Sequence, residues 1–364
     1  MKSSLRPFAW ALSVLCLMVG QALAATPAAS PNPSPDDRKA ARIASWLADE
    51  LAQICPLADA ADQAALERCR QGLTYESKLR TWLPDIVLWG RQKDVNLALK
   101  DSGLNQFSPD MFASMYLPLF MFNGEHTVEY VASEKQYRIH LRSAFRNRLP
   151  PGQFPYPFWH EDAKWSGYER SNEVVFWWGP AKNQFKVVQW SPLGAKPPLL
   201  AVTPEKRPPF DGQWTWTDAK GQMQPKVTVF DGLFEPTNPH LARVEATYKA
   251  LALRLREGQC NDCHVPSNPD NSKQLVMLQT PAHAAGQIKR LLKSVREDKM
   301  PRTSYGIEQP LDPLAKAALL EDGAAFDSAL DDAKRWEAEQ GAALRMARSP
   351  FPRLPMPALT DPGR

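Results

Sequence analysis

The sequence predicts an α+β fold in which helical segments flank a strand-rich middle section. Apolar residues recur at helical spacing near the N-terminus and again in the last third of the chain. Between them, residues 108–235 contain short apolar and aromatic segments separated by turn residues. The expected strands do not alternate with helices, so the sheet is predicted to be antiparallel and not a regular βαβ repeat.

The composition indicates a globular protein. The chain has 364 residues, of which 43% are hydrophobic and 23% charged, and this excludes a wholly disordered protein. At roughly 100–200 residues per domain, two domains are expected. A net charge of +4 is slight for this length, so no nucleic-acid partner is expected. The five cysteines are too few for a fold held together mainly by disulfides.

The N-terminus has the three parts of a secretory signal peptide. Lys2 and Arg6 precede an apolar run over residues 8–20, and a small-residue cleavage site ends at Ala24. The run is shorter than the roughly 20 apolar residues that cross a bilayer. Residues 1–24 are therefore predicted to be cleaved off near Ala24, with no membrane span remaining. The mature protein is expected in an oxidising compartment, most simply a bacterial periplasm.

Two helices are predicted at the start of the mature chain. Residues 25–37 are rich in Pro, Ser and Ala, a composition typical of a flexible linker. The first predicted domain covers 38–237 and begins with a helix, because apolar residues recur at helical spacing over Ile43–Ile54. A second short helix is expected over 62–70. Together the two segments predict an N-terminal helical hairpin.

Cys55 and Cys69 flank the turn between these helices. In an oxidising compartment a disulfide between them is expected. Closing a loop of about 15 residues would stabilise the fold by about 3 kcal/mol in the chain-entropy model. The alternative is a pair of buried, reduced thiols.

Residues 108–235 are predicted to contain antiparallel hairpins. Ser108 is a suitable N-cap for a helix, with Pro109 at the first helical position. Beyond it the apolar segments occur in pairs, and the first pair is centred on Asn123-Gly124, a preferred hairpin turn. The predicted strand pairs are 116–122 with 127–131, 173–178 with 185–190, and 214–217 with 226–230.

The last third of the chain is predicted to be an all-α domain over 238–345. Asn-Pro, Thr-Pro and Asp-Pro pairs each precede an amphipathic run, and proline is favoured in the first turn of a helix. The expected helices cover 238–257, 280–297 and 312–340. Residues 346–364 are rich in proline and are expected to form a disordered tail.

The pattern most specific for chemistry is Cys260-Asn261-Asp262-Cys263-His264. This C-x-x-C-H spacing is that of c-type haem attachment. Cys260 and Cys263 would form thioethers with the haem vinyl groups, and His264 would bind the iron. Five cysteines and six histidines in 364 residues make a chance match rare. Predicted export strengthens this interpretation, because haem c is attached after secretion.

Two other interpretations use the same cysteines. A redox-active dithiol places C-x-x-C in a thioredoxin-like βαβ context, which the predicted elements do not provide. A zinc site needs four ligands, usually including a second paired set, and only scattered histidines would complete it. One covalent haem c is therefore the expected cofactor.

Residues 240–342 resemble a monohaem cytochrome c domain. The resemblance rests on the order of a helix, C-x-x-C-H, a loop, a helix ending in Met-Pro, and closing helices. Leu311–Phe326 is similar to the closing helix of cytochrome domains in larger bacterial proteins. In that family a methionine beside a proline supplies sulfur to the iron, and Met300-Pro301 matches it. The resemblance covers less than a third of the chain, and none is identified for residues 38–235.

The position of Met300 also favours it as the sixth iron ligand. Met300 follows the helix predicted at 280–297, in a loop stiffened by Pro301, and a loop brings sulfur over the haem without strain. His283 is a second candidate, although a histidine in the first turn of a helix is ordinarily exposed. An open sixth position is the third. Met277 lies in an apolar run and is expected to pack in the core.

These observations predict a periplasmic c-type cytochrome that transfers electrons, with His264 and Met300 as axial ligands. One alternative is a haem-dependent oxidoreductase with an open distal site. The other is a haem-containing sensor or ligand-binding protein. The chain is expected to be an electron carrier more than a stand-alone enzyme, and its redox partner is not identified by the sequence.

A basic face is predicted on the helix that precedes Met300. Lys289, Lys293 and Arg296 recur at helical spacing on one side of it. Such a face is either ordinarily solvated or a surface that steers an acidic redox partner.

Overall fold

The computed structural model describes residues 33–102, 104–149, 162–194, 196–202, 215–217, 220–221, 223–225, 233–235, 237–260, 263–264, 281–303 and 305–341. Those from Pro35 onward belong to one compact unit. The predicted signal peptide (1–24) and C-terminal tail (346–364) lie outside the described residues. So do Met277 and the strand predicted at 226–230.

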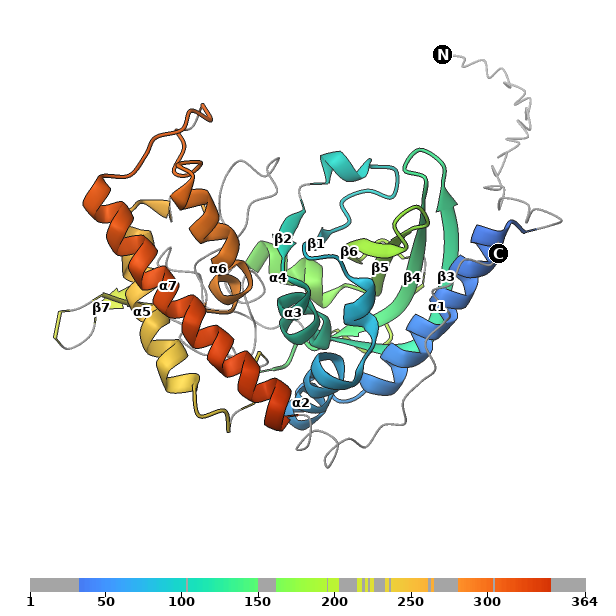
Figure 1. Cartoon of the computed structure of the whole chain (residues 1–364). Helices are drawn as coiled ribbons and strands as arrows, with labels where there is room; N and C mark the ends of the chain where they lie inside the picture. The colour runs from blue at the N-terminus through green and yellow to red at the C-terminus, as the bar shows by residue number, and fades with distance from the viewer. Residues whose placement is uncertain are drawn as a thin grey trace, which may run out of the picture. The chain divides into compact units, whose positions relative to one another are not determined.

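Helices and strands together make an α+β fold, as the sequence predicts (Figure 1). Single turns of π-helix continue α2, α3 and α7. The α-helices are α1 (Pro35–Ile54), α2 (Gln63–Gln71), α3 (Pro109–Met111), α4 (Asp162–Glu169), α5 (Leu241–Glu257), α6 (Pro281–Arg296) and α7 (Pro313–Trp336). The strands are β1 (Val87–Arg91), β2 (Asn105–Phe107), β3 (Phe120–Val131), β4 (Gln136–Phe145), β5 (Glu173–Gly179), β6 (Gln184–Ser191), β7 (Thr215–Thr217) and β8 (Met223–Pro225).

Helix α1 begins at Pro35, inside the predicted linker (25–37), so the last three linker residues are helical. Proline suits the first turn because its missing N–H would have no intrahelical partner there. Asp36 and Asp37 lie in the same turn, where carboxylates interact favourably with the helix dipole. The apolar face that starts at Ile43 is buried, as its spacing predicts.

Helix α2 is joined to the end of α1 by the predicted disulfide. The Asp62 side chain caps α2 by accepting a hydrogen bond from the Ala65 amide at 2.9 Å. Cys55 and Cys69 form the disulfide, with their Cα atoms 4.7 Å apart. Both cysteines are fully buried, so the bridge lies inside the apolar core.

The main sheet has six strands in the order β2-β1-β6-β5-β4-β3. Four of its neighbouring pairs are antiparallel, but β1 and β6 are parallel, with Leu88 opposite Val187. The prediction of a wholly antiparallel sheet is therefore wrong. Strands β1 and β2 were not predicted because both are short, and a short apolar run does not distinguish a strand from a buried helix.

The first predicted hairpin is also wrong. Strand β3 continues straight through Asn123-Gly124, where its register with β4 shifts between Phe122 and His126. Gly124 has a φ of 84°, which suits an irregular, bulged position. The chain reverses at residues 132–135 instead. The Asn123-Gly124 pair did not distinguish a turn from a bulge, because both favour residues that tolerate positive φ.

Of the other two predicted hairpins, the second is present and the third is present in part. Strands β5 and β6 pair antiparallel around a turn at Asn183, which confirms the second prediction. Strand β7 lies where a strand was predicted, but its partner β8 comes before 226–230. Gly221, which lies between β7 and β8, adopts a φ of 74°, a conformation that glycine tolerates.

The three C-terminal helices lie close to their predicted positions. Helix α7 continues through Gly323, because that residue packs against α6: a Cβ there would lie 2.6 Å from Leu292 Cδ2. Asp312 caps α7 by accepting hydrogen bonds from the amides of Leu314 and Ala315.

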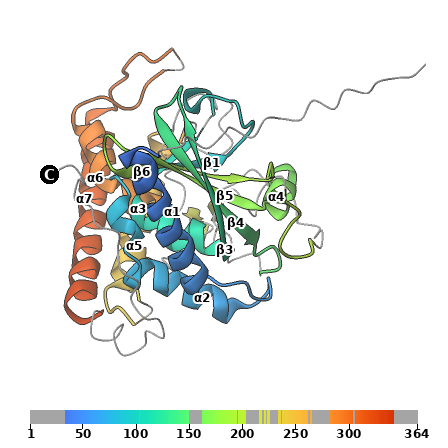
Figure 2. The same ribbon diagram turned by 90° about the vertical axis from the view of Figure 1, so that its right-hand side faces the viewer.

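Buried apolar side chains form separate clusters. The largest fills the space between α1 and one face of the main sheet, which α1 crosses near β3 and β4 (Figure 2). A second cluster is formed by α5, α6 and α7. A small third cluster around Trp177 lies on the other face of the sheet. No helix in the described part of the chain has the length and apolar character needed to cross a membrane.

We predict that replacing Cys55 and Cys69 together by alanine lowers the free energy of unfolding by about 3 kcal/mol, because the closed loop no longer restricts the unfolded chain. Urea denaturation of the oxidised mature protein measures this. Wild type in reducing agent is the control and should lose about as much, whereas the variant should be insensitive to reductant. Reactive thiols at both positions in the unfolded, unreduced protein would contradict the bridge.

Candidate functional site

The C-x-x-C-H segment begins immediately after α5. Gly258 caps the helix, and Gln259 adopts a φ of 56° that redirects the chain. The amide of His264 then donates to the carbonyl of Cys260 at 2.9 Å. This backbone bond places Cys260, Cys263 and His264 within a single turn of the chain.

The two thiols of this turn have different surroundings. Cys260 is half-buried and packs against the cluster of α5, α6 and α7. The Cys260 sulfur and the Leu311 side chain both approach Gly258. A Cβ added to that glycine would lie 3.5 Å from the sulfur and 3.6 Å from Leu311 Cδ2. Cys263 is exposed. The donor set thus has one edge on apolar side chains and the other open, a setting that suits a flat, largely apolar group held by two thioethers.

Met300 lies on a separate segment, the loop that follows α6. It is half-buried. The loop is braced by a short bridge between Arg302 and Glu308, and the side chains of Lys299 and Arg302 both form ion pairs with Glu308. Met300 therefore lies at the base of a loop that these contacts hold together.

His283 is not the exposed side chain that its position in the sequence suggests. Only 2% of its surface is exposed, and its Nε2 lies 2.9 Å from the hydroxyl of Tyr116, with which it shares a hydrogen bond. Burial lowers the pKa of His283 to about 3 and raises the pKa of Tyr116 well above its ordinary value. Both groups are therefore neutral near pH 7, and this imidazole is engaged by the α+β part of the chain.

The basic face on α6 is exposed, as predicted, but one of its charges is balanced. Lys289 forms ion pairs with Asp327 and Asp331 of α7, each at 3.2 Å. These hydrogen bonds raise the pKa of Lys289. Lys293 and Arg296 are also exposed.

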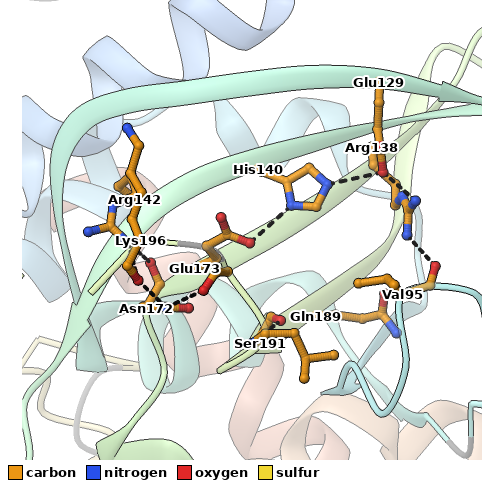
Figure 3. Close-up of polar contacts among 12 residues, drawn as sticks. Val95, Glu129, Arg138, His140, Arg142, Asn172, Glu173, Gln189, Ser191 and Lys196 are labelled. Carbon is orange, nitrogen blue, oxygen red and sulfur yellow. Dashed lines mark hydrogen bonds and ion pairs between the residues drawn. The ribbon is translucent and has the colours of Figure 1, made fainter. Parts of the chain in front are cut away.

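A second polar group of residues lies on the face of the sheet opposite α1 (Figure 3). His140 on β4 is placed between two carboxylates, with Nδ1 3.1 Å from Glu173 and Nε2 3.3 Å from Glu129. Arg138, two residues earlier on the same face, forms an ion pair with Glu129 and donates to the carbonyl of Val95 at 2.7 Å. Contacts between charged or polar side chains thus link β3, β4 and β5 on this face of the sheet.

This cluster was not predicted from the sequence. The alternation of Arg138, His140 and Arg142 with apolar residues in β4 is a recognisable signal for one polar face. It does not identify the acidic partners, because Glu129 and Glu173 come from other strands whose register is set by pairing.

No family model matches the chain, and neither a curated protein nor a solved structure matches it. Within the described residues, no group of three or more His, Cys, Asp or Glu side chains is arranged to hold a metal ion. Asn261, Asp262 and residues 265–280 around the C-x-x-C-H turn lie outside that part of the chain.

We predict that His140 stabilises the fold mainly at low pH. Burial would lower its pKa, but the hydrogen bonds to Glu129 and Glu173 raise the pKa above the ordinary value of 6.5. The stabilisation is therefore complete below pH 6.5 and is lost as the pH rises through the higher pKa of the folded state. Urea denaturation of wild type and His140→Gln over a pH series should show a stability difference that shrinks with rising pH.

The control variant is Glu129→Gln, which removes one of the two carboxylates that bind His140. The stability difference between wild type and this variant should also depend on pH, but less strongly than the difference for His140→Gln. A difference that stays constant, or that grows as the pH rises, would show that the ring is not held as an imidazolium between the two carboxylates.

Proposed function

We propose that this chain is an exported c-type cytochrome that carries one covalent haem and transfers single electrons. The observation that carries the proposal is the C-x-x-C-H sequence, in which a backbone hydrogen bond from His264 to Cys260 keeps both cysteines and the histidine within one turn. Haem c, when bound, supplies a one-electron iron couple. The residues present fit that group, because Cys260 and Cys263 supply the two thioether sulfurs and His264 supplies an axial nitrogen.

The sixth ligand in this proposal is Met300. His283, the competing candidate, has its Nε2 engaged by Tyr116 and is buried beside Phe107. Met300 is half-buried on a loop that follows a helix of the same apolar cluster. A thioether ligand raises the reduction potential relative to a second imidazole, which suits an electron acceptor more than an oxygen-binding site.

Export and division into two domains complete the proposal. The buried Cys55–Cys69 disulfide is compatible with an oxidising compartment such as the periplasm. The separate apolar clusters of the sheet region and of α5, α6 and α7 support an α+β domain over 38–237 followed by a haem domain over 238–345. The exposed Lys293 and Arg296 offer positive charge to an acidic redox partner.

We predict one haem per chain that survives denaturation. Expression with the haem-attachment machinery should give a haem-stained band on a denaturing gel, and Cys260→Ala with Cys263→Ala should abolish it, because no thioether can form. The matched control is Cys55→Ala with Cys69→Ala, which removes the other two mature cysteines and should keep the stain. Staining that survives loss of the C-x-x-C-H thiols would disprove the attachment site.

We also predict that Met300→Ala removes the weak sulfur-to-iron absorption band at the red end of the oxidised spectrum, with haem still attached. The control is His283→Gln, whose amide can keep the bond to Tyr116 and which should retain the band. If the band is absent from wild type, or if the reduced wild type binds carbon monoxide readily, the oxidoreductase with an open distal site becomes the better function.

A further inference from the structure

The hydrogen bond between Tyr116 and His283 joins a phenol to a neutral base inside the protein. Tyr116 is fully buried just before β3, and His283 is 2% exposed in the first turn of α6. The phenol is the stronger donor and an unprotonated imidazole nitrogen is the stronger acceptor, so the O–H donates to Nε2 across 2.9 Å. The phenolic proton therefore has an acceptor already in place.

This acceptor matters most when the phenol is oxidised. Burial raises the pKa of Tyr116 well above its ordinary value, so the intact phenol keeps its proton. A phenol that has lost one electron is, by contrast, a very strong acid. Burial lowers the pKa of His283 to about 3, but its imidazole is still a far stronger base than the oxidised phenol. Oxidation of Tyr116 would thus move its proton to Nε2 and leave a neutral tyrosyl radical.

An indole ring without such an acceptor lies next to this pair. Trp89 of β1 is 2% exposed, and its ring centroid lies 6.4 Å from that of Tyr116. The Trp89 indole N–H is buried and has no hydrogen-bond partner in the described part of the chain. An oxidised indole becomes a weaker oxidant when it gives its N–H proton to an acceptor. Because Trp89 lacks one, its oxidised form stays a strong oxidant and takes an electron from Tyr116.

Contacts between aromatic rings connect Trp89 with the helix on one face of the sheet. The rings in order are Trp46, Trp82, Phe185, Phe176, Phe112 and Trp89, with neighbouring centroids 5.3–6.3 Å apart. The indole N–H groups of Trp46 and Trp82 are also buried without a partner among the described residues. The phenyl rings keep their electrons but couple the indoles electronically. Trp46 on α1, 7% exposed, is the most exposed ring of this series.

We propose that Tyr116 is a redox-active tyrosine that collects one-electron oxidising equivalents from these buried tryptophans. An electron moves from Tyr116 to the oxidised indole of Trp89, which returns to its neutral form, and the phenolic proton moves to Nε2 of His283. The products are a neutral tyrosyl radical and an imidazolium. The initial oxidants are radicals that remove one electron from indole, the azide and carbonate radicals among them, and each is reduced to its anion.

The proposal does not depend on haem, because none of these side chains is a ligand in the proposed haem site. Its failure would leave the C-x-x-C-H attachment site unaffected, and loss of haem attachment would leave the Tyr116–His283 pair in place.

The test treats the full mature chain, fully oxidised, with azide radicals generated by pulse radiolysis. Ascorbate then removes radicals on exposed side chains such as Tyr130 and Tyr305, and electron paramagnetic resonance of the frozen sample measures what persists. Wild type should keep a neutral tyrosyl signal, and Tyr116→Phe should lose it. His283→Gln should also lose it, because an amide can keep the hydrogen bond to Tyr116 but cannot take the proton.

The matched control is Tyr248→Phe. Tyr248 is also buried, but it packs in the cluster of α5, α6 and α7, so this variant should keep the full signal. Trp89→Phe should lower the yield of the radical, because the neighbouring electron acceptor of Tyr116 is lost. Far-ultraviolet circular dichroism and a melting curve should show that all four variants remain folded.

Several outcomes would overturn the proposal. Wild type shows no persistent tyrosyl signal; or the signal survives in Tyr116→Phe; or His283→Gln keeps it in full, which would show that the base is not needed. Loss of the signal in Tyr248→Phe would place the radical on the wrong tyrosine. An unchanged yield in Trp89→Phe would contradict the electron transfer between Trp89 and Tyr116.

Discussion

The contact between α6 and the segment before β3 holds the two parts of this protein together. His283 and Tyr116 share a hydrogen bond, both side chains are buried, and both groups are neutral there. Removing either partner would leave the other unsatisfied, at a cost of about 1–3 kcal/mol. One turn further along α6, Gly286 allows close approach, since a Cβ there would lie 2.4 Å from the hydroxyl of Ser108. The His283–Tyr116 hydrogen bond and the close approach of Gly286 to Ser108 therefore both fix the position of α6.

This constraint reaches both ends of α6. Near its start, Ala285 and Gly286 form part of the wall of a cavity of about 410 Å³. At its other end, the chain leaves toward Met300 through a loop braced by Glu308. Because α6 is one continuous helix of 16 residues, the contacts of His283 and Gly286 near its start also fix where its other end lies. The engagement of His283 also removes the ligand that would have competed most directly with Met300 in the proposed haem site.

The candidate haem site shows how far local sequence leads. C-x-x-C-H is a pattern of five consecutive residues, so its donors can be brought together by one helical turn whatever the rest of the fold does. Burial of His283 was unpredictable from its neighbours, because Tyr116 lies 167 positions away in the sequence. The same is true of His140, whose carboxylate partners come from two other strands. The cavity is likewise lined by residues far apart in the sequence, from Thr74 to Ala338.

Helix starts, the pairing of β5 with β6 and the Cys55–Cys69 bridge were predictable because their signals act over a few residues. Asp62, Ser108 and Asp312 cap helices through hydrogen bonds to amides two or three positions away. The parallel pairing of β1 with β6 and the bulge at Gly124 were decided by tertiary structure. A strand's neighbour and register depend on which distant segment buries its face, and short sequence patterns carry no information about that choice. The sequence by itself thus determined the helix starts, the β5–β6 hairpin, the Cys55–Cys69 bridge and the C-x-x-C-H spacing, whereas the order of the strands, the burial of His283 and the form of the cavity came only from packing between residues far apart in the chain.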